Sequence, residues 1–381
     1  MKFKTPKKLL TRIPLSEATK SAVNFDVNDF TFESILDFEK FLETRFFKGK
    51  RVYALNSGTS AIHLALELLN IKGGDEVICQ TATYIATAVP IIYQNATPIF
   101  VDSEKETGNI CPEQLEIAIL DRIHKGVKPK AIIVVDLYGM PYNAEKVNKI
   151  ALKYNIPIIE DAAEALGAKF DDVYCGNLGD IGVLSFNTNK IFTTLGGGAL
   201  VVASDEAYDM CHYLATHARE DKPYYEHKRI GYNYRMAISS AVFGLSQVDL
   251  IDENIEKRKE IKMFYQNIFN SIKGTFITQE PSEAYQSNFW LSILSVDLNV
   301  YKPTIIEELQ NAFHKENIES RFTWKPMHMQ PLFENCTFYG GNVAFHRFKK
   351  GLCLPSGSNL TKQERQRIEK IIFAILSKEV D

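Results

Sequence analysis

The sequence predicts an α/β fold, in which a mostly parallel seven-stranded sheet is covered by helices and followed by a smaller C-terminal α+β domain. In the first half, short continuous apolar runs rich in β-branched residues alternate with helical patterns, which indicates a parallel sheet buried on both faces. Near residue 246 the alternation of apolar strands and helices ends, and the pattern predicts a long charged helix with one apolar face. We therefore expect a large domain over residues 1–245 and a small domain over residues 246–381.

Each expected element follows from these patterns in chain order. The seven strands are expected at residues 51–55, 76–79, 97–101, 131–135, 156–159, 181–186 and 198–203. Helical patterns lie between several of them, at 61–69 and 143–154. The second half predicts a helix over 246–265, a strand within 288–298, and helices near 304–315 and 361–376. Ligands of such a sheet gather beyond the carboxyl ends of its strands.

The composition narrows the class of protein. A net charge of −3 carries no electrostatic signature of nucleic-acid binding, and no apolar run approaches the ~20 residues that cross a bilayer. The basic start MKFKTPKKLLTR lacks a following apolar segment, so we interpret it as a solvated tail rather than a signal peptide. The six cysteines and eight histidines are scattered, so we expect reduced thiols, a cytoplasmic location and no metal site.

The stretch LNSGTSAIHLAL (55–66) has the pattern of a strand, a small polar turn and a helix. Gly58, Thr59 and Ser60 would lie at the helix N-terminus, where free N–H groups and the helix dipole attract an anion. Because Ser and Thr are common helix caps, this stretch alone favours an ordinary structural cap.

The stretch IPIIEDAAEALGA (156–168) ends a buried strand with Glu160 and Asp161. A carboxylate is thereby placed at the carboxyl edge of the sheet. Two interpretations of Asp161 stay open: it caps a following helix, or it keeps a heterocyclic nitrogen protonated.

The stretch SFNTNKIFTTLGGGALV (185–201) places Lys190 between two predicted core strands. One interpretation is a solvated loop lysine. In a dry site, however, the charged form of lysine is disfavoured, and the neutral amine becomes a nucleophile that can form a Schiff base. Pyridoxal phosphate needs such a lysine, a phosphate cradle and a partner for its ring nitrogen, and the three stretches supply them in order.

Together with GYNYRM (231–236) and WKPMH (324–328), these stretches resemble the DegT/StrS sugar aminotransferases, a family of fold type I pyridoxal phosphate enzymes. The resemblance covers roughly residues 50–375. It implies that Lys190 is the Schiff-base lysine and that Asp161 pairs with the ring nitrogen. It also implies that further residues contact the cofactor, with Asn233 reaching its phosphate from the neighbouring subunit of a homodimer: Gly58, Thr59, Tyr84, Glu164, Ser185 and Asn233.

The chain departs from the family pattern in three places. Glu164 stands where many members have His or Gln, so its contact with the ring hydroxyl depends on its protonation. Leu195 to Gly198 stand where members have Gly-Glu-Gly-Gly. The first fifty residues lack the usual glycine-containing approach to the site.

The resemblance implies that an amino group passes from L-glutamate to C4 of a nucleotide-linked 4-keto-6-deoxy sugar during glycan biosynthesis. Glu164, Asn187 to Lys190, GYNYRM and WKPMH are most similar to C4-aminotransferases that act on UDP-2-acetamido-2,6-dideoxy-4-ketohexose in bacillosamine-type pathways. Trp324 and His328 would then cover the sugar nucleotide; alternatively, Trp324 is a core residue and His328 a satisfied surface histidine.

Other functions stay open. A GDP- or dTDP-linked ketosugar, aminated at C4 or C3, would use the same chemistry. A non-catalytic sugar-binding or regulatory relative would tolerate loss of Lys190 or Asp161, yet both are present. A sugar dehydratase of the same fold has histidine in place of the lysine, so Lys190 argues against that class.

Overall fold

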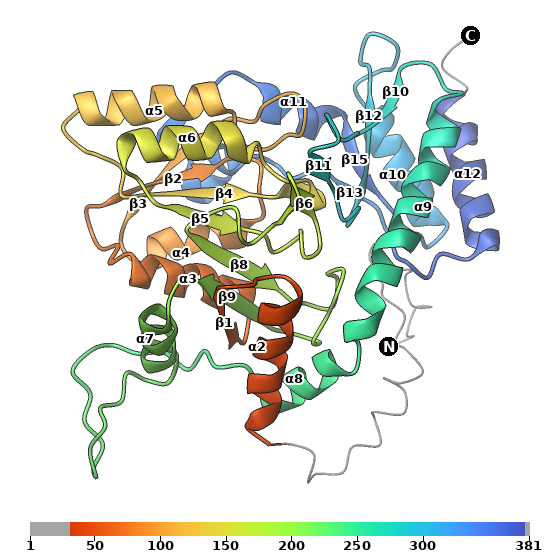
Figure 1. Ribbon diagram of the computed structural model, residues 1–381. Coiled ribbons are helices and arrows are strands. Elements are labelled where there is room, and N and C mark those ends of the chain that lie inside the picture. Colours follow the sequence, from red (N-terminus) through yellow and green to blue (C-terminus); the bar gives the residue numbers. More distant parts are fainter. Residues whose placement is uncertain (1–30, 378–381) are drawn as a thin grey trace, which may run out of the picture.

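An eight-stranded sheet forms the centre of the molecule (Figure 1), a computed structural model that describes residues 31–377. The basic tail expected at the start of the chain lies outside the described residues. The order of the sheet is β1-β9-β8-β5-β4-β2-β3-β14, and β9 runs antiparallel to its neighbours while the other pairings are parallel. Its strands are β1 (Arg51–Leu55), β2 (Glu76–Gln80), β3 (Thr97–Val101), β4 (Ala131–Val135), β5 (Ile158–Asp161), β8 (Ile181–Ser185), β9 (Gly198–Val202) and β14 (Phe338–Tyr339).

All seven expected strands are present, and two details differ from the expectation. The short β14 joins the edge strand β3 as an eighth strand and comes from the C-terminal part of the chain, where its two residues gave no strand pattern. Strand β5 begins two residues later than expected because the N–H of Ile156 still bonds to Ala151 of the preceding helix. As a result, Asp161 is the last residue of the strand.

Helices cover both faces of the sheet, as expected (Figure 1). Alternate residues of each central strand belong to opposite apolar clusters, since a strand points successive side chains to opposite faces. Val77 and Ile133 pack with one group of helices, whereas Ile78 and Ile132 pack with the other. The covering helices are α2 (Glu33–Arg45), α3 (Gly58–Leu68), α4 (Ile85–Tyr93), α5 (Pro112–His124), α6 (Ala144–Tyr154) and α7 (Asp205–Ala215).

A second sheet and its helices build a separate apolar cluster from the C-terminal part of the chain. The helix expected over 246–265 is present as α9, but it begins later, at Ile251, because a short 3-10 turn separates it from α8, which ends at Leu245. The second sheet has the order β10-β12-β15-β13. Helix α8 (Ile238–Leu245) packs instead with α2, since Ala241 belongs to the same apolar cluster as Phe38. The elements of the C-terminal part are α9 (Ile251–Phe269), β10 (Thr275–Ile277), β12 (Ser292–Val296), α10 (Ile305–Lys315), β13 (Arg321–Phe322), α11 (Val343–Lys350), β15 (Gly351–Leu354) and α12 (Lys362–Leu376).

The C-terminal chain also returns to the first half at two places. Strand β14 extends the central sheet, and β11 (Tyr285–Gln286) pairs with β6 (Lys169–Phe170), which in turn pairs with β7 (Val173–Tyr174). The domain boundary at residue 245 stays a prediction. Within residues 31–377, no helix combines the length and the apolar character that crossing a membrane requires.

Candidate active site

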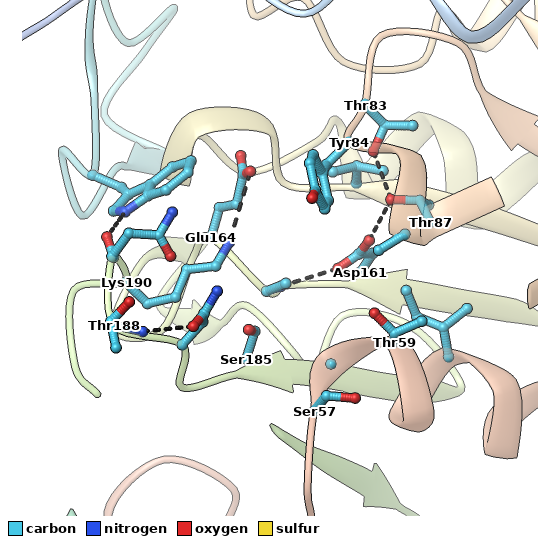
Figure 2. Close-up of a pocket in the computed structure, with 18 of the residues that line it drawn as sticks. Ser57, Thr59, Thr83, Tyr84, Thr87, Asp161, Glu164, Ser185, Thr188 and Lys190 are labelled. Carbon is cyan, nitrogen blue, oxygen red and sulfur yellow. Dashed lines mark hydrogen bonds and ion pairs between the residues drawn. The ribbon is translucent and has the colours of Figure 1, made fainter. Parts of the chain in front are cut away.

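A cavity of about 660 Å³ opens at the carboxyl ends of β1, β4, β5 and β8, where the sheet topology predicts a ligand site. Its far wall comes from the C-terminal half, through Trp290, Leu291, Glu319, Arg321 and Trp324. Eight of the ten residues expected in the site line this cavity: Gly58, Thr59, Tyr84, Asp161, Glu164, Ser185, Lys190 and Trp324. Figure 2 labels all of them except Gly58 and Trp324.

The start of helix α3 forms one end of the cavity. Ser57 caps the helix, since its hydroxyl accepts the N–H of Ser60 at 3.1 Å, while the N–H groups of Gly58 and Thr59 have no acceptor within the helix. A Cβ at Gly58 would lie 3.0 Å from the Cβ of Ser185. A Cβ at Gly198 would lie 2.5 Å from the backbone nitrogen of Gly58. The missing side chains therefore bring the helix start and Ser185 together as an anion cradle.

Asp161 lies at the other side of the cradle, at the end of β5 (Figure 2). Its carboxylate accepts hydrogen bonds from the Thr87 hydroxyl at 2.7 Å and from the Ala163 N–H at 3.2 Å. Burial raises the pKa of Asp161, and the Thr87 hydrogen bond and the positive charge of Lys190 oppose that rise. The helix-cap interpretation is wrong, because residues 162–168 form turns and no helix follows Asp161 there.

Glu160 points to the opposite face of β5 and has a structural role. Its carboxylate accepts the backbone N–H groups of Gly176, Leu178 and Gly179 at 2.6–2.8 Å. It is fully buried and holds the loop before β8. The alternation of the strand thus assigns one carboxylate to a loop and its neighbour to the cavity.

Lys190 enters the cavity from a turn after β8, in which its N–H bonds to the carbonyl of Asn187 at 3.0 Å. Its side chain is only 13% exposed, so the solvated-loop interpretation is wrong. The ammonium nitrogen lies 3.8 Å from a carboxylate oxygen of Glu164 and 4.4 Å from the centre of the Trp290 indole ring. Trp290 also donates its indole N–H to the carbonyl of Asn189 at 2.7 Å, so it supports the lysine turn.

Glu164 faces Lys190 across the cavity (Figure 2). Its second carboxylate oxygen accepts the backbone N–H of Tyr138 at 2.7 Å. Burial raises the pKa of Glu164 to about 7, although the charge of Lys190 acts to lower it. At neutral pH, both the neutral and the ionised forms of this side chain are therefore populated.

The aromatic side of the cavity brings Tyr84 and Trp324 together, with ring centroids 6.0 Å apart. Tyr84 is 57% exposed, which leaves its ring available to a molecule bound in the cavity. The buried indole N–H of Trp324 has no acceptor among the described residues. A donor of this kind is normally satisfied by water or by a bound molecule.

Two expected residues do not line the cavity. The imidazole of His328 hydrogen-bonds the Thr81 hydroxyl at 2.7 Å and stacks on Phe338, so the alternative of a satisfied histidine describes it better than a substrate contact does. Asn233 is exposed, and its backbone carbonyl accepts a hydrogen bond from Asn56. Its side chain does not reach the cavity of its own chain.

Sequence reasoning missed several residues of the far wall. Trp290 lies just before β12, inside a stretch that we expected only to be a strand. Arg321 lies in the two-residue strand β13 and pairs with Glu319, and both line the cavity. The sequence offered only two signals for these residues: a tryptophan at the start of the expected strand, and an arginine in a short segment with a weak strand pattern.

The model of the DegT/DnrJ/EryC1/StrS aminotransferase family matches residues 28–373. EpsN of Bacillus subtilis (strain 168), whose name places it among the pyridoxal phosphate-dependent aminotransferases, is 42% identical over 328 residues, covering 85% of this chain and 83% of that protein. A GDP-perosamine synthase of Escherichia coli O157:H7 is 36% identical over 310 residues, or 81% of each chain.

Two further similarities are more distant in sequence. The UDP-4-amino-4,6-dideoxy-N-acetyl-beta-L-altrosamine transaminase of Campylobacter jejuni (strain 81-176) is 28% identical over 339 residues, or 86% of each chain. The crystal structure of a DegT DnrJ EryC1 StrS aminotransferase from Brucella abortus has a TM-score of 0.84 at 27% identity, with 95% of both chains covered.

Proposed function

The chain belongs to the DegT/DnrJ/EryC1/StrS aminotransferase family, and from that premise we propose that it transfers the amino group of L-glutamate to C4 of a nucleotide-linked 4-keto-6-deoxy sugar. The acceptor we propose is UDP-2-acetamido-2,6-dideoxy-4-ketohexose. The protein is a nucleotide-sugar aminotransferase of fold type I that depends on pyridoxal phosphate. The observation that carries the proposal is that Lys190, Asp161 and the start of α3 line one cavity with Trp324.

The residues of the cavity fit the cofactor. Ser185 and the N–H groups of Gly58 and Thr59 would hold a phosphate, in a cradle that a Cβ at Gly58 would crowd and that a Cβ at Gly198 would force to shift. Asp161 would hold a proton at the ring nitrogen, and the exposed ring of Tyr84 would cover one ring face. When bound, pyridoxal phosphate supplies a ring that delocalises the electron pair left on the substrate carbon.

Lys190 would carry out the proton transfer. In its neutral form, Nζ would accept the proton from the α-carbon of the amino donor, and it would hold that proton inside a largely buried cavity until it is delivered again. The Glu164 carboxylate lies 3.8 Å from Nζ of Lys190, so it can hold the lysine side chain in place inside the cavity.

The aromatic wall supports a sugar nucleotide as the acceptor. Trp324 offers an apolar face beside Tyr84, and its unpaired indole N–H can donate to a sugar or phosphate oxygen. The relative from Campylobacter jejuni is named for a UDP-linked sugar, which supports the UDP acceptor. The relative from Escherichia coli is named for a GDP-linked product and is more similar to this chain, so a GDP-4-ketosugar is the second candidate.

We also propose a homodimer with shared active sites. The segment after α7 leaves the body of the molecule as a long excursion that carries exposed Tyr224, Tyr225 and Ile230 (Figure 1). Asn233 follows this excursion and has no role in its own cavity. A two-fold partner would cover the apolar side chains and receive Asn233 at its phosphate site.

The test begins with the purified protein and its visible absorbance after incubation with pyridoxal phosphate. A visible band that bleaches when L-glutamate is added is expected, and a protein that stays colourless would indicate a non-catalytic sugar-binding relative instead. UDP-, GDP- and dTDP-linked 4-ketosugars are then supplied with glutamate, and products are identified by mass spectrometry and NMR. Amination of the UDP sugar supports the proposed acceptor, and amination of the GDP sugar alone selects the second candidate. Lys190→Ala is the matched control and should give no product.

A further inference from the structure

Tyr138 lies behind the wall of the cavity and connects two parts of that wall. It follows β4 in the short 3-10 turn Leu137–Gly139, is buried, and does not itself line the cavity. Its backbone N–H donates to Glu164 at 2.7 Å. Its phenolic oxygen accepts the backbone N–H of Trp324 at 2.8 Å, and the two rings lie with centroids 5.5 Å apart.

The backbone of Tyr138 is in a conformation that aromatic residues rarely adopt. Its φ is 60° and its ψ is 19°, in the left-handed region that normally favours glycine. Gly139 follows with a φ of 86°, and a Cβ there would lie 1.9 Å from the side-chain oxygen of Asn288. Buried Asn288 in turn donates to the carbonyls of Glu164 and Leu166. Strained residues persist only where their surroundings hold them, and they gather at functional sites.

Tyr138 fixes one end of the segment 324–328, and Thr81 fixes the other. The N–H of Met327 donates to the Thr81 carbonyl at 2.8 Å, and the His328 ring bonds the Thr81 hydroxyl. Trp324, at the end that Tyr138 fixes, faces the cavity. The segment belongs to the C-terminal half, whereas both anchors belong to loops that follow strands of the central sheet.

We propose that Tyr138 is a positioning residue for the acceptor sugar: its phenolic oxygen fixes Trp324 and thereby sets the aromatic wall against which the sugar nucleotide binds. This role rests on the proposed function, because it takes Trp324 as a contact of the acceptor. It predicts that the amino donor, which reacts at Lys190, is affected much less.

Tyr138→Phe tests the proposal because it removes the phenolic oxygen while the ring and the N–H to Glu164 remain. Tyr142→Phe is the matched control. Tyr142 lies in the same connection, is fully buried, and donates its hydroxyl to Asn148 at 2.9 Å, away from the cavity. Each variant thus loses one buried tyrosine hydroxyl, and the two tyrosines lie close in the sequence. Only the hydroxyl of Tyr138 contacts Trp324.

The first measurement needs no substrate. The chain has two tryptophans, so Trp290→Phe leaves Trp324 as a single fluorescent reporter. In this background, Tyr138→Phe should raise the acrylamide quenching constant of Trp324 about twofold, whereas Tyr142→Phe should leave it unchanged. Equal constants in all three chains would overturn the proposal. If Trp290→Phe does not fold, Trp324→Phe chains with and without each tyrosine change give the Trp290 signal for subtraction.

The second measurement separates the two half-reactions of the holoenzyme. Tyr138→Phe should raise the KM for the ketosugar about fivefold, the effect of losing one neutral hydrogen bond, while the rate with glutamate stays within twofold. An equal loss in both half-reactions, or an unchanged ketosugar KM, would contradict the positioning role. If the wild-type protein aminates no ketosugar, the proposed function fails, and the quenching experiment still decides whether Tyr138 fixes Trp324.

Discussion

Two neighbouring carboxylates, Glu160 and Asp161, differ in role because β5 turns successive side chains to opposite faces. Glu160 accepts three backbone N–H groups away from the cavity, whereas Asp161 faces the cavity and keeps capacity for a cationic group there. A ring nitrogen that carries a proton would offset the burial that raises the pKa of Asp161.

Asp161→Asn should therefore lower kcat more than cofactor affinity. The amide keeps the shape and the Thr87 contact but cannot hold a proton at the ring nitrogen, and the loss of a charge-assisted hydrogen bond costs about 1.5–3 kcal/mol. Because charge develops most in the transition state, kcat should fall by roughly 10- to 100-fold. Steady-state kinetics and a cofactor titration measure the two quantities. A near-normal kcat with weakened cofactor binding would leave Asp161 a purely structural residue.

Glu164 makes the free energy of unfolding depend on pH, and its raised pKa sets the direction of that dependence. Burial raises its pKa from 4.5 to about 7, so the folded protein binds this proton more tightly than the unfolded chain does. The stabilisation from this proton is present below about pH 4.5 and is lost as the pH rises to about 7. In cofactor-free protein, Glu164→Gln should therefore gain roughly 2–3 kcal/mol of unfolding free energy over wild type between pH 5 and pH 8.

Urea unfolding of both proteins at pH 5 and pH 8 measures this difference. Comparing a variant with the wild type at each pH removes the contributions of the buried carboxyl groups that do not interact with Glu164. A difference that does not change with pH would show that Glu164 is ionised throughout this range.

At the scale of elements, the start of α3 and the start of β9 depend on one close contact. Gly198 begins β9 directly beside the Ser57–Gly58 peptide, and it has no room for a Cβ. At Gly196, two residues earlier, a Cβ would have no neighbour within 4 Å, and the backbone is not left-handed. Within the glycine run, Gly198 thus has no room for a side chain next to the helix start, whereas Gly196 has room for one.

Gly198→Ala should displace the helix start, weaken cofactor binding by at least about tenfold and destabilise the protein by about 1–3 kcal/mol through overpacking. Gly196→Ala is the matched control and should stay within about 0.5 kcal/mol of wild type. Cofactor titration and thermal unfolding of both variants measure the effects. Equal behaviour of the two alanine variants would show that the cradle does not depend on this approach.

The elements that the sequence predicted well are those with local patterns. Continuous apolar runs predicted the seven main strands, and the spacing of Asp161 and Lys190 relative to strand ends predicted their meeting in the cavity. Tyr138 and Trp290 carry no comparable signal, since their contacts depend on tertiary packing between distant segments. His328 was expected either to contact the substrate or to be a satisfied surface histidine; it bonds to Thr81, stacks on Phe338 and does not line the cavity of its own chain.

On the scale of the whole molecule, the segment between α7 and α8 leaves the body of the protein, and its exposed apolar side chains suggest a partner chain (Figure 1). The sequence 215–230 is polar and contains Pro223, and the structure places it away from the core (Figure 1). Its exposed tyrosines and Ile230 would be costly to leave in water, and a two-fold partner would cover them. The proposed dimer therefore predicts that Asn233 acts in the active site of the partner subunit.

Mixed dimers test that statement. Lys190→Ala chains are refolded with Asn233→Ala chains, after each variant has been shown to be nearly inactive alone. If Asn233 completes the partner's phosphate site, one site of the mixed dimer carries both changes and the other carries neither. Activity should then return to about half of the wild-type value per mixed dimer, provided that the two sites work independently. If Asn233 acts within its own chain, every site carries one change, so mixed dimers verified by differential tags would stay as inactive as their parents and the shared site would be refuted.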